Sequence, residues 1–108
     1  MDVENDDGAL CTVEKAQDSS GALVVKLTGE IDMSNAESLG RAIGELIDNG
    51  TERLVVDLTA LEFMDSSGIA MLLRVTSDVD SVRLRNPSNV VRRIIESTGL
   101  GDVLRVEP

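Results

Sequence analysis

Residues 54–76, LVVDLTALEFMDSSGIAMLLRVT, decide the fold, because the spacing of their apolar side chains changes partway along the stretch. Residues 54–58 are apolar at all but one position, which is typical of a central strand that is covered on both faces. From residue 69 onward the apolar side chains recur every three or four positions, as on one face of a helix. The segment Asp65-Ser66-Ser67-Gly68 is therefore predicted to lie at a strand-to-helix junction.

Upstream of this stretch, two β-rich segments predict a hairpin. Residues 9–16 alternate weakly between apolar and polar side chains, and residues 22–28 are rich in β-branched and apolar ones. Ser19-Ser20-Gly21 between them supplies turn residues. We expect a helix after the hairpin, because Ser34 and Glu37 fit a capping box and an apolar stripe follows over residues 36–47. Asn49-Gly50 is expected to end that helix.

Downstream, a short strand is predicted over residues 82–84, and Asn86-Pro87 interrupts it. A helix opened by Ser88 should end at Gly99, and a last strand is expected over residues 103–106. The order β-β-α-β-α-β-α-β indicates an α/β fold, with helices packed on a mixed sheet of about five strands. We expect one domain over residues 9–108, preceded by a flexible acidic arm over residues 1–8.

Composition excludes several classes of function. The chain has 20 acidic and 10 basic residues, a net charge of −10, which repels nucleic acid and anionic membranes. Histidine is absent and Cys11 is the only cysteine, so a Ser-His-Asp triad or a cysteine-rich zinc site is impossible. No nucleotide-binding glycine motif, membrane span or signal peptide is recognisable. We therefore expect a cytoplasmic protein that is not an enzyme and holds no cofactor.

Three carboxylates, Asp32, Asp57 and Asp65, are predicted to fall near strand ends, so a magnesium site deserves consideration. The fit is poor, because a phospho-receiver would also need an acidic pair after its first strand and a lysine late in the chain. For Asp57, the end of a strand or the cap of a turn is the favoured interpretation.

The Asp65-Ser66-Ser67-Gly68 segment is the sharpest feature of the sequence. An aspartate and serines at a helix start can cap the free backbone N–H groups. Capping needs only one side chain, but this segment has two adjacent hydroxyls. Its glycine would also leave room for a partner to approach closely. A phosphate here would add a charge of about −1.5 to −2, which the helix start tolerates but an apolar or acidic partner surface would not.

Three blocks resemble a known family. Residues 55–70 resemble the signature of bacterial anti-sigma factor antagonists, which have the STAS fold. LTGEID, residues 27–32, looks like that family's LxGELD segment, and residues 86–100 resemble its closing helix. Together the blocks cover most of residues 9–106.

The resemblance implies a transcription regulator controlled by phosphorylation. It implies that Ser66 is phosphorylated by a partner that is both an anti-sigma factor and a serine kinase, and that Asp32 contributes to kinase binding. The unphosphorylated form would bind the kinase and release the sigma factor, and a PP2C-type phosphatase would reset the phosphorylated form. Ser67 remains open as the acceptor. The residues expected to bind the partner are Asp32, Asp65, Ser66, Ser67, Gly68 and Met71.

One alternative stays open: an accessory STAS subunit that binds the ATPase of a lipid ABC transporter. Some such subunits carry an Asp-Ser-x-Gly junction and a helix that residues 69–73 also approximate. Ser67 and the Phe-Met pair before Asp65 favour the antagonist. Only 18 residues separate Gly68 from Pro87, fewer than in typical antagonists, so the intervening helix should be short.

Overall fold

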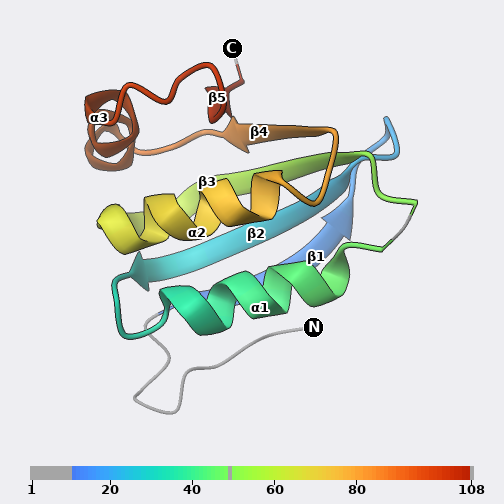
Figure 1. The fold of residues 1–108 in the computed structure, drawn as a ribbon, viewed down its shortest axis with the longest axis horizontal. Coiled ribbons are helices and arrows are strands. Elements are labelled where there is room, and N and C mark those ends of the chain that lie inside the picture. The colour runs from blue at the N-terminus through green and yellow to red at the C-terminus, as the bar shows by residue number, and fades with distance from the viewer. Residues whose placement is uncertain (1–10, 49, 108) are drawn as a thin grey trace.

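A five-stranded sheet in the order β1-β2-β3-β4-β5 forms the centre of the computed structural model, which describes residues 11–48 and 50–107 (Figure 1). The strands are β1 Cys11–Gln17, β2 Leu23–Ile31, β3 Arg53–Met64, β4 Ser81–Arg85 and β5 Arg105–Val106. The helices are α1 Ala36–Leu46, α2 Ser66–Thr76 and α3 Asn89–Ser97. The predicted order of elements is confirmed.

The sheet is mixed, as predicted. Strand β1 pairs antiparallel with β2, and all later neighbours are parallel. Each parallel pair is connected by one helix, because parallel strands can be joined only by a crossover. The opening hairpin turns at residues 18–21, where Gly21 has a φ of +88° and the Asp18 carboxylate accepts the Ser20 and Ala22 backbone N–H groups.

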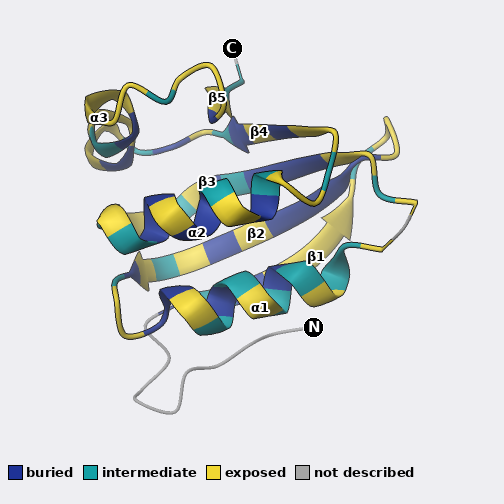
Figure 2. Ribbon diagram, in the orientation of Figure 1, coloured by how far each residue is buried: buried dark blue, intermediate teal, exposed yellow. Residues whose placement is uncertain are grey.

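One core holds the helices to the sheet. Figure 1 shows α1 and α2 in front of the same face of the sheet, and Figure 2 shows buried residues concentrated along the strands behind them. Val25 and Leu27 of β2 and Val56 of β3 contribute fully buried side chains, and Val91 and Ile95 bring α3 into the same cluster. The core is built almost entirely from Leu, Ile, Val, Ala and Met, because Phe63 is the only aromatic residue in the sequence.

Several boundaries differ from the sequence prediction. Strand β3 runs on to Met64, because an irregularity in its pairing with β2 lets it continue past Asp57. Helix α1 ends at Leu46, where the next residue is extended, so the helix stops before Gly50. The last strand is shorter than expected, since residues 103 and 104 form a turn. Helix α3 is followed, as predicted, by Gly99 with a φ of +71°.

The predicted acidic arm over residues 1–8, the start of the hairpin at residues 9 and 10, and Asn49 lie outside the described residues. Within the described ranges, no helix has the length and apolar character needed to cross a membrane.

Candidate functional site

The candidate site lies at the edge of the sheet where β2 and β3 end. Ile31 and Met64, the last residues of the two strands, are partners in the parallel ladder. The backbone N–H of Asp65 donates to the carbonyl of Ile31 over 3.2 Å. Asp32 and Asp65, both predicted to fall near strand ends, follow the two strands directly and are therefore brought to the same edge.

Asp65 caps helix α2, which confirms the capping role predicted for it. Its Oδ1 accepts the backbone N–H groups of Ser67 at 2.8 Å and Gly68 at 3.4 Å, and also the hydroxyl of Ser67. The Ser67 hydroxyl, followed by these backbone donors, holds the pKa of Asp65 below its ordinary value. The carboxylate at the start of α2 is thus charged at neutral pH.

The two neighbouring serines differ in environment. Ser66 is the first residue of α2 and is exposed, and no other described residue forms a hydrogen bond with its hydroxyl. Ser67 is partly buried and donates its hydroxyl to Asp65. Ser66 is consequently the more accessible of the two hydroxyls that the sequence left open.

The loop that carries Asp32 is fixed by a buried asparagine. Asn35 is only 1% exposed; its side-chain amide donates to the carbonyl of Glu30 at 2.9 Å and accepts the backbone N–H of Asp32 at 3.0 Å. The predicted capping box is wrong, because Ser34 bonds back to Asp32 and the residue before α1 is Asn35. Asn35 therefore positions Asp32 at the edge.

Two residues that we predicted to contact a partner are inside the protein. Gly68 is buried, and a Cβ at this position would come within 2.3 Å of the Met64 Cγ. Met71 is fully buried and lies against Gly40 of α1. The glycine thus makes room for interior packing, not for a partner, and both positions serve the packing of α2.

Sequence reasoning missed two exposed apolar side chains at the same edge. Met33, directly after Asp32, is 85% exposed, and Phe63, directly before Met64, is 40% exposed. A large apolar residue in a turn next to a candidate site residue was the available signal. Exposed apolar side chains beside a polar group are typical of a protein-binding surface.

Asp57 does not belong to this edge. It lies inside β3, where its Oδ1 accepts the backbone N–H and hydroxyl of Thr59. The prediction that it falls near a strand end is therefore wrong, because β3 continues for seven residues beyond it. Nor do the described residues contain a cluster of acidic or sulfur ligands that could hold a metal ion.

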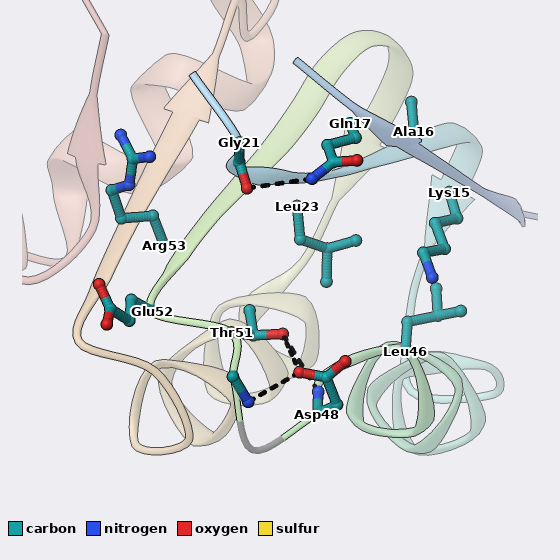
Figure 3. Close-up of a pocket in the computed structure, with 11 residues that line it drawn as sticks. Lys15, Ala16, Gln17, Gly21, Leu23, Leu46, Asp48, Thr51, Glu52 and Arg53 are labelled. Atoms are coloured by element: carbon teal, nitrogen blue, oxygen red, sulfur yellow. Dashed lines mark hydrogen bonds between the residues drawn. The ribbon is translucent and has the colours of Figure 1, made fainter. Parts of the chain in front are cut away.

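A hollow of about 440 Å³ lies at the other end of the sheet (Figure 3). Lys15, Leu46, Asp48 and Arg53 are among the residues that line it. The Asp48 carboxylate is already engaged by the Gly50 N–H and the Thr51 hydroxyl. None of the candidate residues at the Ser66 edge lines this hollow.

Comparison with known sequences gives consistent results. The family model of the STAS domain matches residues 14–108. The anti-sigma-F factor antagonist RsfB of Mycobacterium tuberculosis is 35% identical over 92 residues, which cover 82% of this chain and 75% of the relative. An anti-sigma F factor antagonist of Lysinibacillus sphaericus is 33% identical over 84 residues, covering 73% of this chain and 72% of the relative.

Solved structures with the same fold carry similar names. The chain resembles the crystal structure of an anti-sigma factor antagonist from Mycobacterium paratuberculosis with a TM-score of 0.80 and 30% identity, covering 98% of this chain and 91% of the other. It resembles unphosphorylated SpoIIAA, also an anti-sigma factor antagonist, with a TM-score of 0.73 and 25% identity over 89% of this chain and 88% of the other. The phosphorylated form of SpoIIAA from Bacillus gives a TM-score of 0.64 at 25% identity over 89% of this chain and 91% of the other.

Proposed function

This chain belongs to the STAS domain family, and we propose that it works as an anti-sigma factor antagonist whose binding is switched off by phosphorylation of Ser66. The observation that carries the proposal is the difference between the two adjacent hydroxyls. Ser66 is exposed and free of hydrogen bonds to other described residues, whereas the Ser67 hydroxyl is donated to Asp65. A kinase could reach Ser66 without breaking the cap of α2.

The start of α2 can accept a phosphate. The Ser67 and Gly68 N–H groups already donate to Asp65, so it is the dipole of the helix start that favours the added negative charge. The charge of about −1.5 to −2 would lie next to Asp65, Asp32 and the exposed Met33. The phosphate would therefore weaken binding of a partner. An apolar partner surface would have to desolvate the charge, and an acidic one would be repelled by it.

The partners are inferred from the role of this family. We propose that the unphosphorylated chain binds an anti-sigma factor that is also a serine kinase, and that a PP2C-type phosphatase restores the binding form. The proposed surface comprises Asp32, Asp65, Ser66 and Ser67, with Met33 and Phe63 added. The chain itself acts in the cytoplasm as a binding protein without enzymatic activity. The relatives named above are anti-sigma factor antagonists, which favours this role over that of a transporter subunit.

The test is phosphate mapping after incubation of the full chain with ATP and the serine kinases of the host. We expect one phosphate on the wild type and on Ser67→Ala, and none on Ser66→Ala. Ser67→Ala is the matched control, because it removes the neighbouring hydroxyl and leaves Ser66 in place.

Binding to the same kinase gives the second measurement. Ser66→Ala should bind as tightly as the unphosphorylated wild type, and Ser66→Asp should bind at least about tenfold more weakly, which corresponds to about 1.4 kcal/mol. A phosphate on Ser67 in the wild type, or equal affinities for Ser66→Ala and Ser66→Asp, would refute the proposed switch.

A further inference from the structure

Two turns of the same form begin side by side at the Ser66 edge. In the first turn, the Asp32 Oδ1 accepts both the backbone N–H and the hydroxyl of Ser34. In the second turn, the Asp65 Oδ1 accepts the same two groups of Ser67. Each turn thus has an aspartate at its first position and a serine at its third, and only the residue between them differs.

The two turns start in register. Ile31 and Met64, which precede them, are partners in the parallel ladder between β2 and β3, and neighbouring strands lie about 4.8 Å apart. Met33 and Ser66 hold the middle positions of their turns, and both are exposed. The place equivalent to the proposed phosphate acceptor is therefore occupied by a methionine.

Of the three methionines that the structure describes, Met33 alone is exposed. Its exposed fraction is 85%, whereas Met64 and Met71 have no exposed surface. An oxidant in solution reaches a thioether only where the side chain is accessible. The thiol of Cys11 does not compete, because it is buried and desolvation raises its pKa to about 11, so little thiolate is present at neutral pH.

We propose that Met33 is a site of reversible oxidation, and that its sulfoxide weakens partner binding at the Ser66 edge. A hydroperoxide is the class of oxidant that the surroundings favour. It is neutral, whereas an anionic oxidant would be repelled by the carboxylates of Asp32 and Asp65 at the same edge.

The oxidation needs no other reactant. With hydrogen peroxide, a lone pair of the Met33 sulfur attacks one peroxide oxygen, so that an S–O bond forms and the O–O bond breaks. The proton on the transferred oxygen passes to the departing hydroxide, which leaves as water. The sulfur loses two electrons and the peroxide gains them. A methionine sulfoxide reductase with a thiol reductant reverses the change.

The sulfoxide alters the surface that a partner would bury. A thioether is apolar and flexible, whereas a sulfoxide is polar and chiral. Because burial of the new oxygen without a hydrogen bond is unfavourable, we expect the oxidised chain to bind about tenfold more weakly. Unlike a phosphate on Ser66, the sulfoxide adds no charge. The effect on binding rests on the proposed function, but the selective oxidation of Met33 does not.

The first measurement uses the full chain alone. The protein is treated with hydrogen peroxide, and the oxidised methionines are followed over time by peptide mass spectrometry. We expect the sulfoxide to form at Met33 at least about tenfold faster than at Met64 or Met71, because only Met33 is accessible. In urea the three rates should become similar. Similar rates in the folded chain would overturn the proposal.

Amide resonances give a second readout that needs no partner. Oxidation of Met33 should shift the amides of Ser66 and Ser67, because the two turns start from paired residues. It should leave the amide of Gly21 unchanged, since the hairpin turn lies at the other end of β2. Met33→Leu, which keeps an apolar side chain without sulfur, should show no shift after the same treatment. Unchanged Ser66 and Ser67 resonances in the oxidised wild type would contradict the proposed coupling of the two turns.

The last measurement is binding to the kinase identified by phosphate mapping. Peroxide-treated wild type should bind about tenfold more weakly than the untreated chain, and a methionine sulfoxide reductase with dithiothreitol should restore the affinity. The affinity of Met33→Leu should be the same before and after peroxide. An equal loss in both proteins would place the effect at another residue and refute the proposal.

The outcomes separate this proposal from the proposed function. If phosphate mapping finds no kinase, the proposed function fails by its own test and the effect on binding fails with it. The oxidation rates of Met33, Met64 and Met71 and the shifts at Ser66 would still decide whether Met33 is the oxidation site. If the kinase binds and oxidation of Met33 leaves its affinity unchanged, the switch at Ser66 stands and the regulatory role of Met33 is refuted.

Discussion

Gly68 and Met64 lie so close together that a Cβ on Gly68 would come within 2.3 Å of the Met64 Cγ and 2.8 Å of its Sδ. Met64 is fully buried at the end of β3, and Gly68 is in the first turn of α2. The end of β3 can approach the start of α2 this closely only because residue 68 is a glycine. This close approach sets the position of Ser66, which lies between Met64 and Gly68 in the chain.

Gly68→Ala is therefore expected to destabilise the protein by about 1–3 kcal/mol, as overpacking of a full core usually does. Urea unfolding followed by far-UV circular dichroism measures the change. Gly44→Ala is the matched control: Gly44 lies in α1 with no atom within 4 Å of an added Cβ, so this change should stabilise by about 0.5–1 kcal/mol. A Gly68→Ala protein as stable as the wild type would show that Met64 can move aside.

Asn35→Ala should cost about 1–3 kcal/mol of unfolding free energy, because the Glu30 carbonyl and the Asp32 N–H would lose their partner. Ser34→Ala is the control, and it tests whether Ser34 caps α1, as the sequence predicted, or lies outside the cap, as in the structure. If Ser34 capped α1, its loss would cost about 1 kcal/mol; as an exposed residue outside the cap it should change stability by less than about 0.5 kcal/mol. Similar losses of stability for both variants would support the capping box predicted at Ser34 and Glu37.

The cap of α2 should weaken in acid. The pKa of Asp65 is lower in the folded chain than its ordinary value of about 3.9, so the carboxylate contributes stability that is present above pH 4 and is lost as pH falls through the lowered pKa. The amide resonances of Ser67 and Gly68 should report this titration by NMR. In Asp65→Asn they should not titrate, and a wild-type midpoint at or above 3.9 would contradict the assignment.

Met33 is expected to add affinity for the anti-sigma partner without supporting the fold, because its side chain is 85% exposed. Met33→Ser should weaken binding of the unphosphorylated chain by about 1–2 kcal/mol, roughly five- to thirtyfold. Calorimetric titration against the kinase identified by phosphate mapping measures this. Val90→Ser removes a half-exposed apolar side chain from α3 and should leave affinity unchanged; equal effects would indicate that Met33 lies outside the interface.

Much of the fold could be predicted because its signals are local. The change from a continuous apolar run to helical spacing across residues 54–76 requires a strand, a junction and a helix, and the alternation of such units requires crossovers to parallel neighbours. The cap at Asp65 was predictable for the same reason, since a side chain and the N–H groups two and three residues ahead are always close in a helix start.

Boundaries and roles that depend on distant residues could not be predicted. The sequence predicts Ser34 as the cap of α1, but in the structure Asn35 precedes the helix without a side-chain capping bond and is instead buried, where it donates to the carbonyl of Glu30. The length of β3 depends on its pairing with β2, which tolerates an irregularity beyond Asp57.

The sequence by itself determined the class of fold, the order of its elements and the junction that carries Ser66, because periodicity and capping act between residues a few positions apart. The tertiary structure alone decided which chemistry is accessible there. Packing against β3 and α1 buries Gly68 and Met71 and leaves Ser66 and Met33 exposed. Exposure at this junction is set by packing between elements that are distant in the chain, so the short pattern of residues 65–71 did not reveal it.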